Sequence, residues 1–318
     1  MQAVVIDKYG SVDVLQLREL ERPSPQADQV LIEVYYASIN PIDTKIRDGS
    51  MSFRFGKSFP KIMGFDASGV VHEVGAAVTH LKVGDAVYAR SDQLCGHTQA
   101  EFVAIGASAV AKKPSSLSYI EAAAMPLAGL TALQGLRDDC QLQAGQHVLI
   151  VGASGGVGTY AIQIAKAMGA TVTAVCSGVN ADLVVGLGAD KVIDYHQSPA
   201  LDGHTVYDAI YDVVGSLAYG KARKQLSRRG HFAAAVPSLN VIFSMFIANR
   251  WRRQQARFVM CKSSGVDLEM LAQWAEQGKL RSIIDEVLPL NKVQKGHQKI
   301  ATKRCVGKIV IAVQPNTA

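Results

Sequence analysis

The 318-residue sequence lacks the features that hold a protein in a membrane or join it by cross-links. No apolar run approaches the ~20 residues of a membrane-spanning helix, so we expect no membrane span. The five cysteines are scattered without a C-x-x-C pair, which argues against a structural zinc site and a disulfide framework. The amino terminus has no basic stretch followed by a long apolar one, so it predicts a strand rather than a signal peptide. A reducing, cytoplasmic compartment is therefore expected.

Charge is also sparse, because only 19% of residues are charged, but the balance is basic, with a formal net charge of +6. One local cluster runs from Arg250 to Arg253 and is followed by Arg257. We expect a solvated basic helix face there, and a nucleic-acid patch is the alternative. An anionic cofactor would suit the same balance.

The pattern of apolar residues and turn signals changes after about residue 118. Before that point, short β-type runs at 30–36, 67–74 and 86–89 alternate with Gly and Asp turn signals, which indicates a mostly antiparallel β domain. Beyond it, apolar strands alternate with helical stretches, a pattern typical of βαβ units and a parallel sheet. The final strand, 307–313, is expected to return to the first domain. We predict one domain of residues 1–118 plus 287–318 and another of residues 119–286.

The strongest local signal is a glycine-rich turn between a buried strand at 147–151 and a helix at 157–168. A dinucleotide diphosphate needs main-chain N–H groups that it can approach closely and a helix N-terminus aimed at its charge. Gly155 and Gly156 remove side chains from that approach, and Gly158 lets the helix pack closely. The motif is A-x-G-x-x-G from Ala153, and the alternative is a tight turn without a ligand.

The end of the next strand bears on the choice of coenzyme. An NAD enzyme places Asp or Glu there to bind the ribose 2′-hydroxyl, but this chain has Ser177 and then Asn180. Both can donate hydrogen bonds to the 2′-phosphate of NADP, so NADPH is the expected cofactor. No Arg or Lys stands beside them and Asp182 is close, and Ser177 is also a natural helix N-cap.

Seven motifs in order along almost the whole chain resemble the medium-chain dehydrogenase/reductase superfamily, in its zinc-free quinone oxidoreductase (zeta-crystallin-like) and enone reductase branch. The motifs are residues 38–43, 64–71, 83–88, 128–132, 154–158, 187–190 before Asp194-Tyr195, and 307–310. The resemblance implies an α/β fold class, with a Rossmann doubly wound parallel sheet domain and a GroES-like, mostly antiparallel β catalytic domain. Members of this branch often pair as homodimers, and residues 257–261 look like the edge strand through which they pair.

Zinc-dependent members of the superfamily carry a catalytic Cys near Asn40 and a Gly-His-Glu where this chain has Gly64-Phe65-Asp66. Both are missing, as is a four-cysteine zinc lobe, so no metal site is expected. Without those ligands an alcohol is not polarised for oxidation, and an already activated acceptor is favoured. We therefore expect hydride transfer from NADPH to a small-molecule quinone, enal or enone.

The resemblance also implies roles for single positions. Those that hold the diphosphate are Ser154, Gly155, Gly156 and Val157. Those that surround the 2′-phosphate are Ser177, Asn180 and Tyr195. Those that place the nicotinamide are Thr131, Val214 and Ala235.

On the catalytic side, the resemblance implies that Asn40 faces nicotinamide and substrate. Many quinone oxidoreductases have a Tyr two residues after Asp43, where this chain has Lys45, as in enone reductases and reticulon-interacting relatives. Lys45 is the candidate that stabilises the developing oxyanion or delivers the proton; a solvated surface lysine is the alternative. Two other functions stay open: an enoyl-thioester reductase of the same superfamily, and a nucleotide-binding regulatory or RNA-binding protein that uses the Arg250–Arg257 segment. We expect no nucleic-acid partner.

Overall fold

The computed structural model describes residues 1–236 and 253–314. Their contacts divide the chain into two compact units, of which unit 1 comprises Met1–Leu127 with Ser263–Ala318 and unit 2 comprises Ala128–Lys262. These units are defined by contacts between residues and are not themselves domains. The domain boundaries expected at 118/119 and 286/287 therefore stay a prediction.

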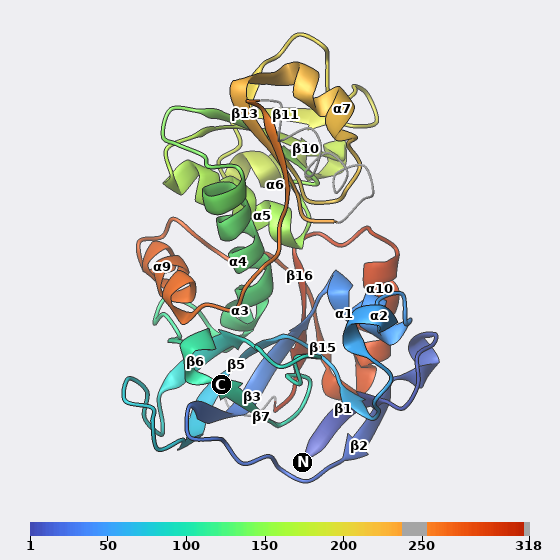
Figure 1. Cartoon of the computed structure of the whole chain (residues 1–318), viewed down its shortest axis with the longest axis vertical. Helices are drawn as coiled ribbons and strands as arrows, with labels where there is room; N and C mark the ends of the chain where they lie inside the picture. The colour runs from blue at the N-terminus through green and yellow to red at the C-terminus, as the bar shows by residue number, and fades with distance from the viewer. Residues whose placement is uncertain (237–252, 315–318) are drawn as a thin grey trace. The chain divides into compact units, whose positions relative to one another are not determined.

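Unit 1 is built on a seven-stranded sheet of order β15-β16-β3-β5-β6-β8, with β7 paired to β3 (Figure 1). Its strands are β3 (Gln29–Ile39), β5 (Asp66–Val74), β6 (Ala86–Arg90), β7 (Phe102–Gly106), β8 (Val110–Lys112), β15 (Ile284–Pro289) and β16 (Lys308–Ala312). Every pairing but the parallel β15–β16 is antiparallel, which confirms the expected β-type texture. Strand β16 pairs with β3, so the final strand returns to this unit as expected.

A small sheet and short helices complete unit 1. The sheet has the order β2-β1-β4, with β1 (Gln2–Ile6), β2 (Gln16–Glu19) and β4 (Lys61–Ile62). The helices are η1 (Val12–Val14), α1 (Pro41–Arg47), α2 (Ser52–Phe55), η2 (Ala107–Ala109), α3 (Tyr119–Ala124), α9 (Gly265–Glu276), η6 (Leu290–Lys292) and α10 (Val293–Ala301). Alternate residues of β3, among them Val30, Ile32 and Val34, are fully buried in the core of this unit, as the period of a strand requires.

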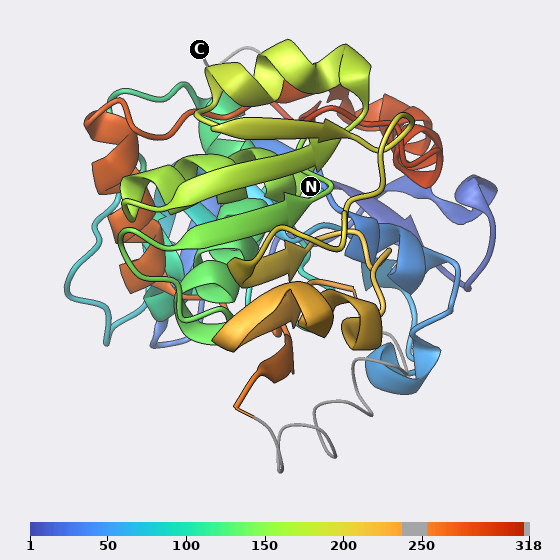
Figure 2. The same cartoon turned by 90° about the horizontal axis from the view of Figure 1, so that it is seen from above.

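Unit 2 holds a six-stranded, all-parallel sheet of order β11-β10-β9-β12-β13-β14 (Figure 2). Its strands are β9 (His147–Val151), β10 (Thr171–Cys176), β11 (Lys191–Asp194), β12 (Tyr207–Asp212), β13 (Leu226–Ala234) and β14 (Gln255–Phe258). Counted along the chain this is the order 3-2-1-4-5-6, the doubly wound Rossmann arrangement, which confirms the expected fold class. Ligands bind such sheets at the carboxyl ends of the strands, where the order reverses between β9 and β12.

The helices of this half are α4 (Pro126–Gln134), the π-helix η3 (Gly135–Asp139), α5 (Gly156–Ala167), η4 (Gly178–Asn180), α6 (Ala181–Gly186), α7 (Tyr219–Ala222) and η5 (Arg223–Gln225). The apolar spacing over residues 217–226 is typical of a single helix, but the chain instead forms α7 and η5 and enters β13 already at Leu226. The apolar spacing there reflects core packing of Tyr219, Ala222 and Leu226 rather than a continuous helix. The expected edge strand at 257–261 is also displaced, since β14 covers Gln255–Phe258.

Three residues of the basic cluster, Arg250, Trp251 and Arg252, lie outside the described residues. Arg257 lies in β14 rather than on a helix, and Arg253 precedes that strand. The expected helix face is therefore wrong for Arg257. No helix in residues 1–236 or 253–314 is long and apolar enough to cross a bilayer.

Candidate active site

The glycine turn of unit 2 lies at the carboxyl end of β9. Three of its glycines, Gly152, Gly155 and Gly158, differ in what a side chain would meet at each position. Gly152 has φ +83°, and a Cβ built on it would lie 2.5 Å from a Val214 methyl. Gly158 packs so closely under the turn that a Cβ there would collide with the Gly152 carbonyl and the Ala153 main chain. Gly155 differs, because its Cβ would meet only the Gly152 carbonyl oxygen, at 3.5 Å, so the space beside it is open.

Helix α5 begins in this turn without a capping side chain. Gly155 is its N-cap, with extended φ −80° and ψ 178° and no side-chain hydrogen bond to the helix. The main-chain bond from Thr159 N to the Gly155 carbonyl, 3.0 Å, starts the helical ladder. The amides of Gly156, Val157 and Gly158 precede that bond and are left for an external acceptor. An open glycine before uncapped amides fits the diphosphate of a dinucleotide.

The expected 2′-phosphate residues gather at the end of β10. Asn180 Nδ2 donates to Ser154 Oγ at 3.1 Å, which joins the turn after β9 to the turn after β10. Ser177 is the N-cap of η4, and its side chain makes no capping bond. Tyr195 N donates to the Cys176 carbonyl at 3.2 Å, while its ring is 56% exposed.

A carboxylate that the sequence reasoning missed lies at the same place. Asp194, the last residue of β11, pairs in register with Cys176 and stands beside Gly178, where a Cβ would lie 2.5 Å from Asp194 Oδ2. The sequence search covered only the end of β10, and Asp194 comes from the neighbouring strand. Its carboxylate can accept hydrogen bonds from ribose hydroxyls and would repel a phosphate placed against it.

The expected nicotinamide residues are anchored to the sheet around β12. The buried Asp212 accepts from the amides of Val214 (3.1 Å) and Gly215 (2.8 Å) through Oδ1 and from Leu217 N (2.6 Å) through Oδ2. Burial raises the pKa of Asp212, and these amide donors oppose the rise. Asp212 therefore shapes the loop that presents Val214, which is 53% exposed. Sequence reasoning missed it, although an Asp that ends a buried strand was a visible signal.

The other two nicotinamide positions are held by the same strand. Ala235 N donates to the Asp212 carbonyl at 3.0 Å. Thr131, on α4, is 8% exposed, and its carbonyl accepts from the Tyr211 hydroxyl at 2.8 Å. Strand β12 thus positions Thr131, Val214 and Ala235 through two adjacent residues, Tyr211 and Asp212.

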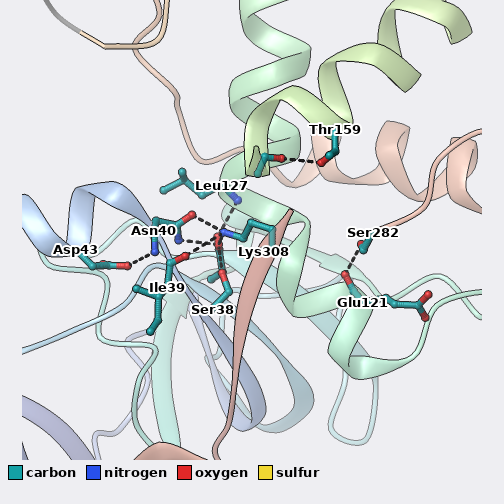
Figure 3. Close-up of polar contacts among 11 residues, drawn as sticks. Ser38, Ile39, Asn40, Asp43, Glu121, Leu127, Thr159, Ser282 and Lys308 are labelled. Carbon is teal, nitrogen blue, oxygen red and sulfur yellow. Dashed lines mark hydrogen bonds and ion pairs between the residues drawn. The ribbon is translucent and has the colours of Figure 1, made fainter. Parts of the chain in front are cut away.

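Unit 1 contains a buried polar network centred on Asp66, whose side chain is 0% exposed. Figure 3 labels its other members, Ser38, Asn40, Leu127 and Lys308. Asp66 Oδ2 accepts from Ser38 Oγ at 2.6 Å and from Asn40 Nδ2 at 2.8 Å, and Oδ1 accepts from Leu127 N at 2.7 Å. Lys308, on β16, lies with its Nζ 2.5 Å from Asn40 Oδ1 and 3.3 Å from Asp66 Oδ2. Both oxygens of this carboxylate therefore accept hydrogen bonds, three at Oδ2 and one at Oδ1.

The network fixes the orientation of the Asn40 side-chain amide. Asn40 is 1% exposed and precedes α1 as its N-cap, with its main-chain N–H donating to Asp43 Oδ2 at 2.7 Å. Its amide oxygen receives Lys308 and its amide nitrogen donates to Asp66, so the two ends of the amide cannot be exchanged without placing donor against donor. One N–H of the Asn40 amide is left for another partner.

Asp43 adds a second buried carboxylate, which is 0% exposed, to the single cation of the network. Burial raises the pKa of Asp43 most strongly and the charge of Asp66 adds to the rise, while the Asn40 amide and Lys308 oppose it; the resulting pKa is about 7. Two carboxylates beside one ammonium cannot both ionise cheaply in a dry site. The network can therefore hold one proton near neutral pH.

Lys45, the candidate catalytic cation, lies half-buried on α1. No hydrogen bond or ion pair in the described part of the chain joins it to Asn40. Lys308 and Asp66, by contrast, bracket Asn40 and were missed, although both belong to motifs that the resemblance contains. The available signal was a charged residue at the start of each of two mostly apolar strands, 66–74 and 308–312. Within the described ranges, no group of three His, Cys, Asp or Glu side chains could hold a metal ion.

This chain is similar to known protein families and to known proteins over nearly its whole length. Residues 26–185 match the family model of the alcohol dehydrogenase GroES-like domain, and residues 187–311 match that of the zinc-binding dehydrogenase. A bovine mitochondrial protein named NAD(P)H oxidoreductase RTN4IP1 is 35% identical over 98% of this chain and 89% of its own. The chloroplastic NADPH-dependent alkenal/one oxidoreductase of Arabidopsis thaliana is 34% identical over 98% of this chain and 79% of its own. The solved quinone oxidoreductase of Coxiella burnetii superimposes with a TM-score of 0.90, with 32% identity over 99% of both chains.

Proposed function

Because the chain belongs to the medium-chain dehydrogenase/reductase superfamily, in the branch of quinone and enone reductases, we propose that it transfers a hydride from NADPH to a quinone or an α,β-unsaturated carbonyl without zinc. It is an NADPH-dependent oxidoreductase, as its relatives are. The observation that carries this proposal is the open, uncapped glycine turn at the carboxyl end of β9.

The residues of unit 2 fit a dinucleotide in three groups. The amides of Gly156, Val157 and Gly158 hold the diphosphate, with Ser154 beside them. Ser177, Asn180 and Tyr195 hold the 2′-phosphate, against the charge of Asp194, so discrimination between NADPH and NADH rests on neutral donors. Thr131, Val214 and Ala235, all anchored to β12, place the nicotinamide. The bound coenzyme supplies the hydride, and the protein supplies its position.

Asp66 supports the zinc-independent part of the proposal. Its two oxygens accept from four donors, one of which is the ammonium of Lys308. A metal ion would have to displace that ammonium and break the bonds to Ser38 and Asn40. The buried cation beside this carboxylate is therefore a lysine, and the acceptor must be activated by its own conjugation.

The acceptor side is assigned to Asn40 and Lys45. Lys308 and Asp66 fix the Asn40 amide, which orients the acceptor through its remaining N–H. Lys45 stabilises the negative charge that develops on the acceptor oxygen and delivers a proton to it. In this scheme Lys308 and Asp66 are positioning residues.

The function is tested by NADPH oxidation with quinones, short enals and enones, run in parallel with NADH. The expected result is acceptor-dependent oxidation that is faster with NADPH. No oxidation with any acceptor, together with no NADPH bound in a titration, would overturn the proposal.

The role of Lys45 needs its own variant. Lys45→Met should lower kcat by roughly 10²-fold, the typical contribution of a positioned acid, and leave the KM for NADPH unchanged. Lys57→Met, at an exposed lysine outside α1, is the matched control and should keep full activity. Unchanged turnover in Lys45→Met would remove Lys45 from the mechanism.

We also propose a homodimer in a reducing, cytoplasmic compartment. Strand β14 stands last in the sheet order of the described residues, next to β13, and members of the branch that this chain resembles often pair as dimers at this end of the sheet. All five cysteines are free thiols, which persist in a reducing compartment. A solution mass of twice 34.0 kDa by light scattering is expected, and a mass of 34.0 kDa would contradict the dimer.

A further inference from the structure

A polar cleft of about 530 Å³ lies on unit 2, apart from the glycine turn. Its lining consists of Gln141, Arg229, His231, Arg253, Gln255 and Arg257. Among the residues that the structure describes, three guanidinium groups line this cleft and no carboxylate does.

The cleft is built by two neighbouring parallel strands. Arg229 and His231 alternate along β13, and Gln255 and Arg257 alternate along β14, with His231 and Gln255 paired in register. Alternate residues of a strand face the same side of its sheet, so these side chains share one face. They occupy the amino-terminal and middle parts of β13 and β14, whereas the glycine turn follows the carboxyl end of β9. The cleft is therefore a different site from the coenzyme turn.

Hydrogen bonds hold part of this surface in place. Arg257 donates through Nη1 to the Asp138 carbonyl and through Nη2 to Gln255 Oε1, both at 3.3 Å. His231 Nδ1 lies 3.3 Å from the Asp139 carbonyl oxygen. Arg229 and Arg253 are exposed at the rim. An arginine cluster of this kind has one anchored guanidinium and two that can close on a ligand.

The charges around the cleft remain positive after the nearby acids are counted. Asp138 is paired with Arg137 at 2.7 Å. Asp139 lies near Arg257, and burial raises its pKa to about 6 while Arg257 opposes the rise. At neutral pH, three guanidinium groups thus face at most one free carboxylate.

We propose that this cleft binds a small polyphosphorylated ligand of nucleotide size. Planar guanidinium groups bind phosphate oxygens in bidentate pairs, and the volume lies within the range of small-molecule sites. The amides of Gln141 and Gln255 can bond the uncharged part of such a ligand. This inference does not depend on the proposed function.

The test is a calorimetric titration of the full chain, saturated with NADPH and held at fixed ionic strength, with inorganic tripolyphosphate and separately with ATP. One further ligand per chain is expected, and Arg229→Gln and Arg253→Gln should each weaken it about fivefold or more. Arg228→Gln is the matched control, because Arg228 is equally exposed, adjacent on β13 and outside the cleft. Tighter binding of ATP than of tripolyphosphate would identify a nucleotide as the occupant.

Two outcomes would overturn the proposal. One is an equal loss in Arg228→Gln and Arg229→Gln, which would mean diffuse attraction to basic surface. The other is binding of a single-stranded RNA with none of tripolyphosphate or ATP, which would mean a nucleic-acid surface instead. Melting curves of the variants check that each remains folded.

Discussion

The glycine turn of unit 2 and the Asp66 network of unit 1 both provide hydrogen-bond donors for a negative charge. The donors of the turn belong to the main chain, whereas those of the network belong mainly to side chains. The turn presents bare main chain, and its key residue, Gly155, has open space where a side chain would be. The network consists mainly of side chains from distant segments, and its centre, Asp66, accepts hydrogen bonds from four donors. A site of the first kind is destroyed by one added methyl group. A site of the second kind is destroyed by one removed partner.

The largest effect is expected from removing the cation of the network. Lys308→Met leaves Asp66 charged, buried and short of one donor, so the free energy of unfolding should fall by about 3–5 kcal/mol. Urea unfolding of the wild type and of Lys308→Met at pH 7.5 measures this loss of unfolding free energy. The double variant Lys308→Met/Asp66→Asn carries neither charge and should lose less than the two single losses added together. Strict additivity would show that the two groups do not act as a pair.

The next effect concerns the extra carboxylate of the network, and its sign follows from the pKa of Asp43. That pKa is about 7 in the folded chain and 3.8 for an unperturbed aspartate, so between these values the folded state holds a proton that the unfolded state has lost. The proton stabilises the fold fully below the lower value, and the stabilisation disappears as pH rises through about 7. The wild-type unfolding free energy should therefore fall by about 2–3 kcal/mol between pH 5 and pH 8 relative to Asp43→Asn.

Urea unfolding of both proteins across that pH range measures this difference. The comparison with Asp43→Asn removes the contribution of other groups, such as Asp139, that titrate nearby. Parallel curves for the two proteins would mean that Asp43 does not hold the proton of the network.

The smallest effect on the fold is expected in the turn, where a methyl group should act on the ligand alone. Gly155 has φ −80°, which alanine adopts freely, so Gly155→Ala should change the unfolding free energy by less than about 0.5 kcal/mol. It should still weaken NADPH about tenfold or more, because the methyl occupies the approach of the diphosphate. Gly158→Ala is the contrast, since its methyl meets main chain and should cost both stability and binding. Equal behaviour of the two variants would contradict the assignment of their roles.

The turn could be predicted from the sequence because all its parts are contiguous. Strand, glycines and helix follow one another within residues 147–167, and the chain's alternation of strands and helices predicted the parallel sheet around them. What failed nearby came from neighbouring strands: Asp194 reaches Gly178 only because β11 pairs with β10 in the register that sets it opposite Cys176.

The network could not be predicted in the same way. Its members come from distant parts of the chain: Asn40 and Lys308, which are hydrogen-bonded, are 268 residues apart. They meet because β3 pairs with β5, which sets Ser38 opposite Asp66, and with β16, which sets Ile39 opposite Ile309. Strand pairing and register depend on how side chains pack throughout the core, so they could not be derived from the residue pattern of this one sequence. A role for Lys308 therefore required the structure.

The claim that main-chain amides of the turn hold the coenzyme is tested most directly by amide hydrogen exchange with and without NADPH. The account predicts slower exchange at Gly156, Val157 and Gly158 when NADPH is bound, and unchanged exchange in β1 (Gln2–Ile6). Unchanged exchange at these three amides, at an NADPH concentration that a separate titration shows to be saturating, would contradict it.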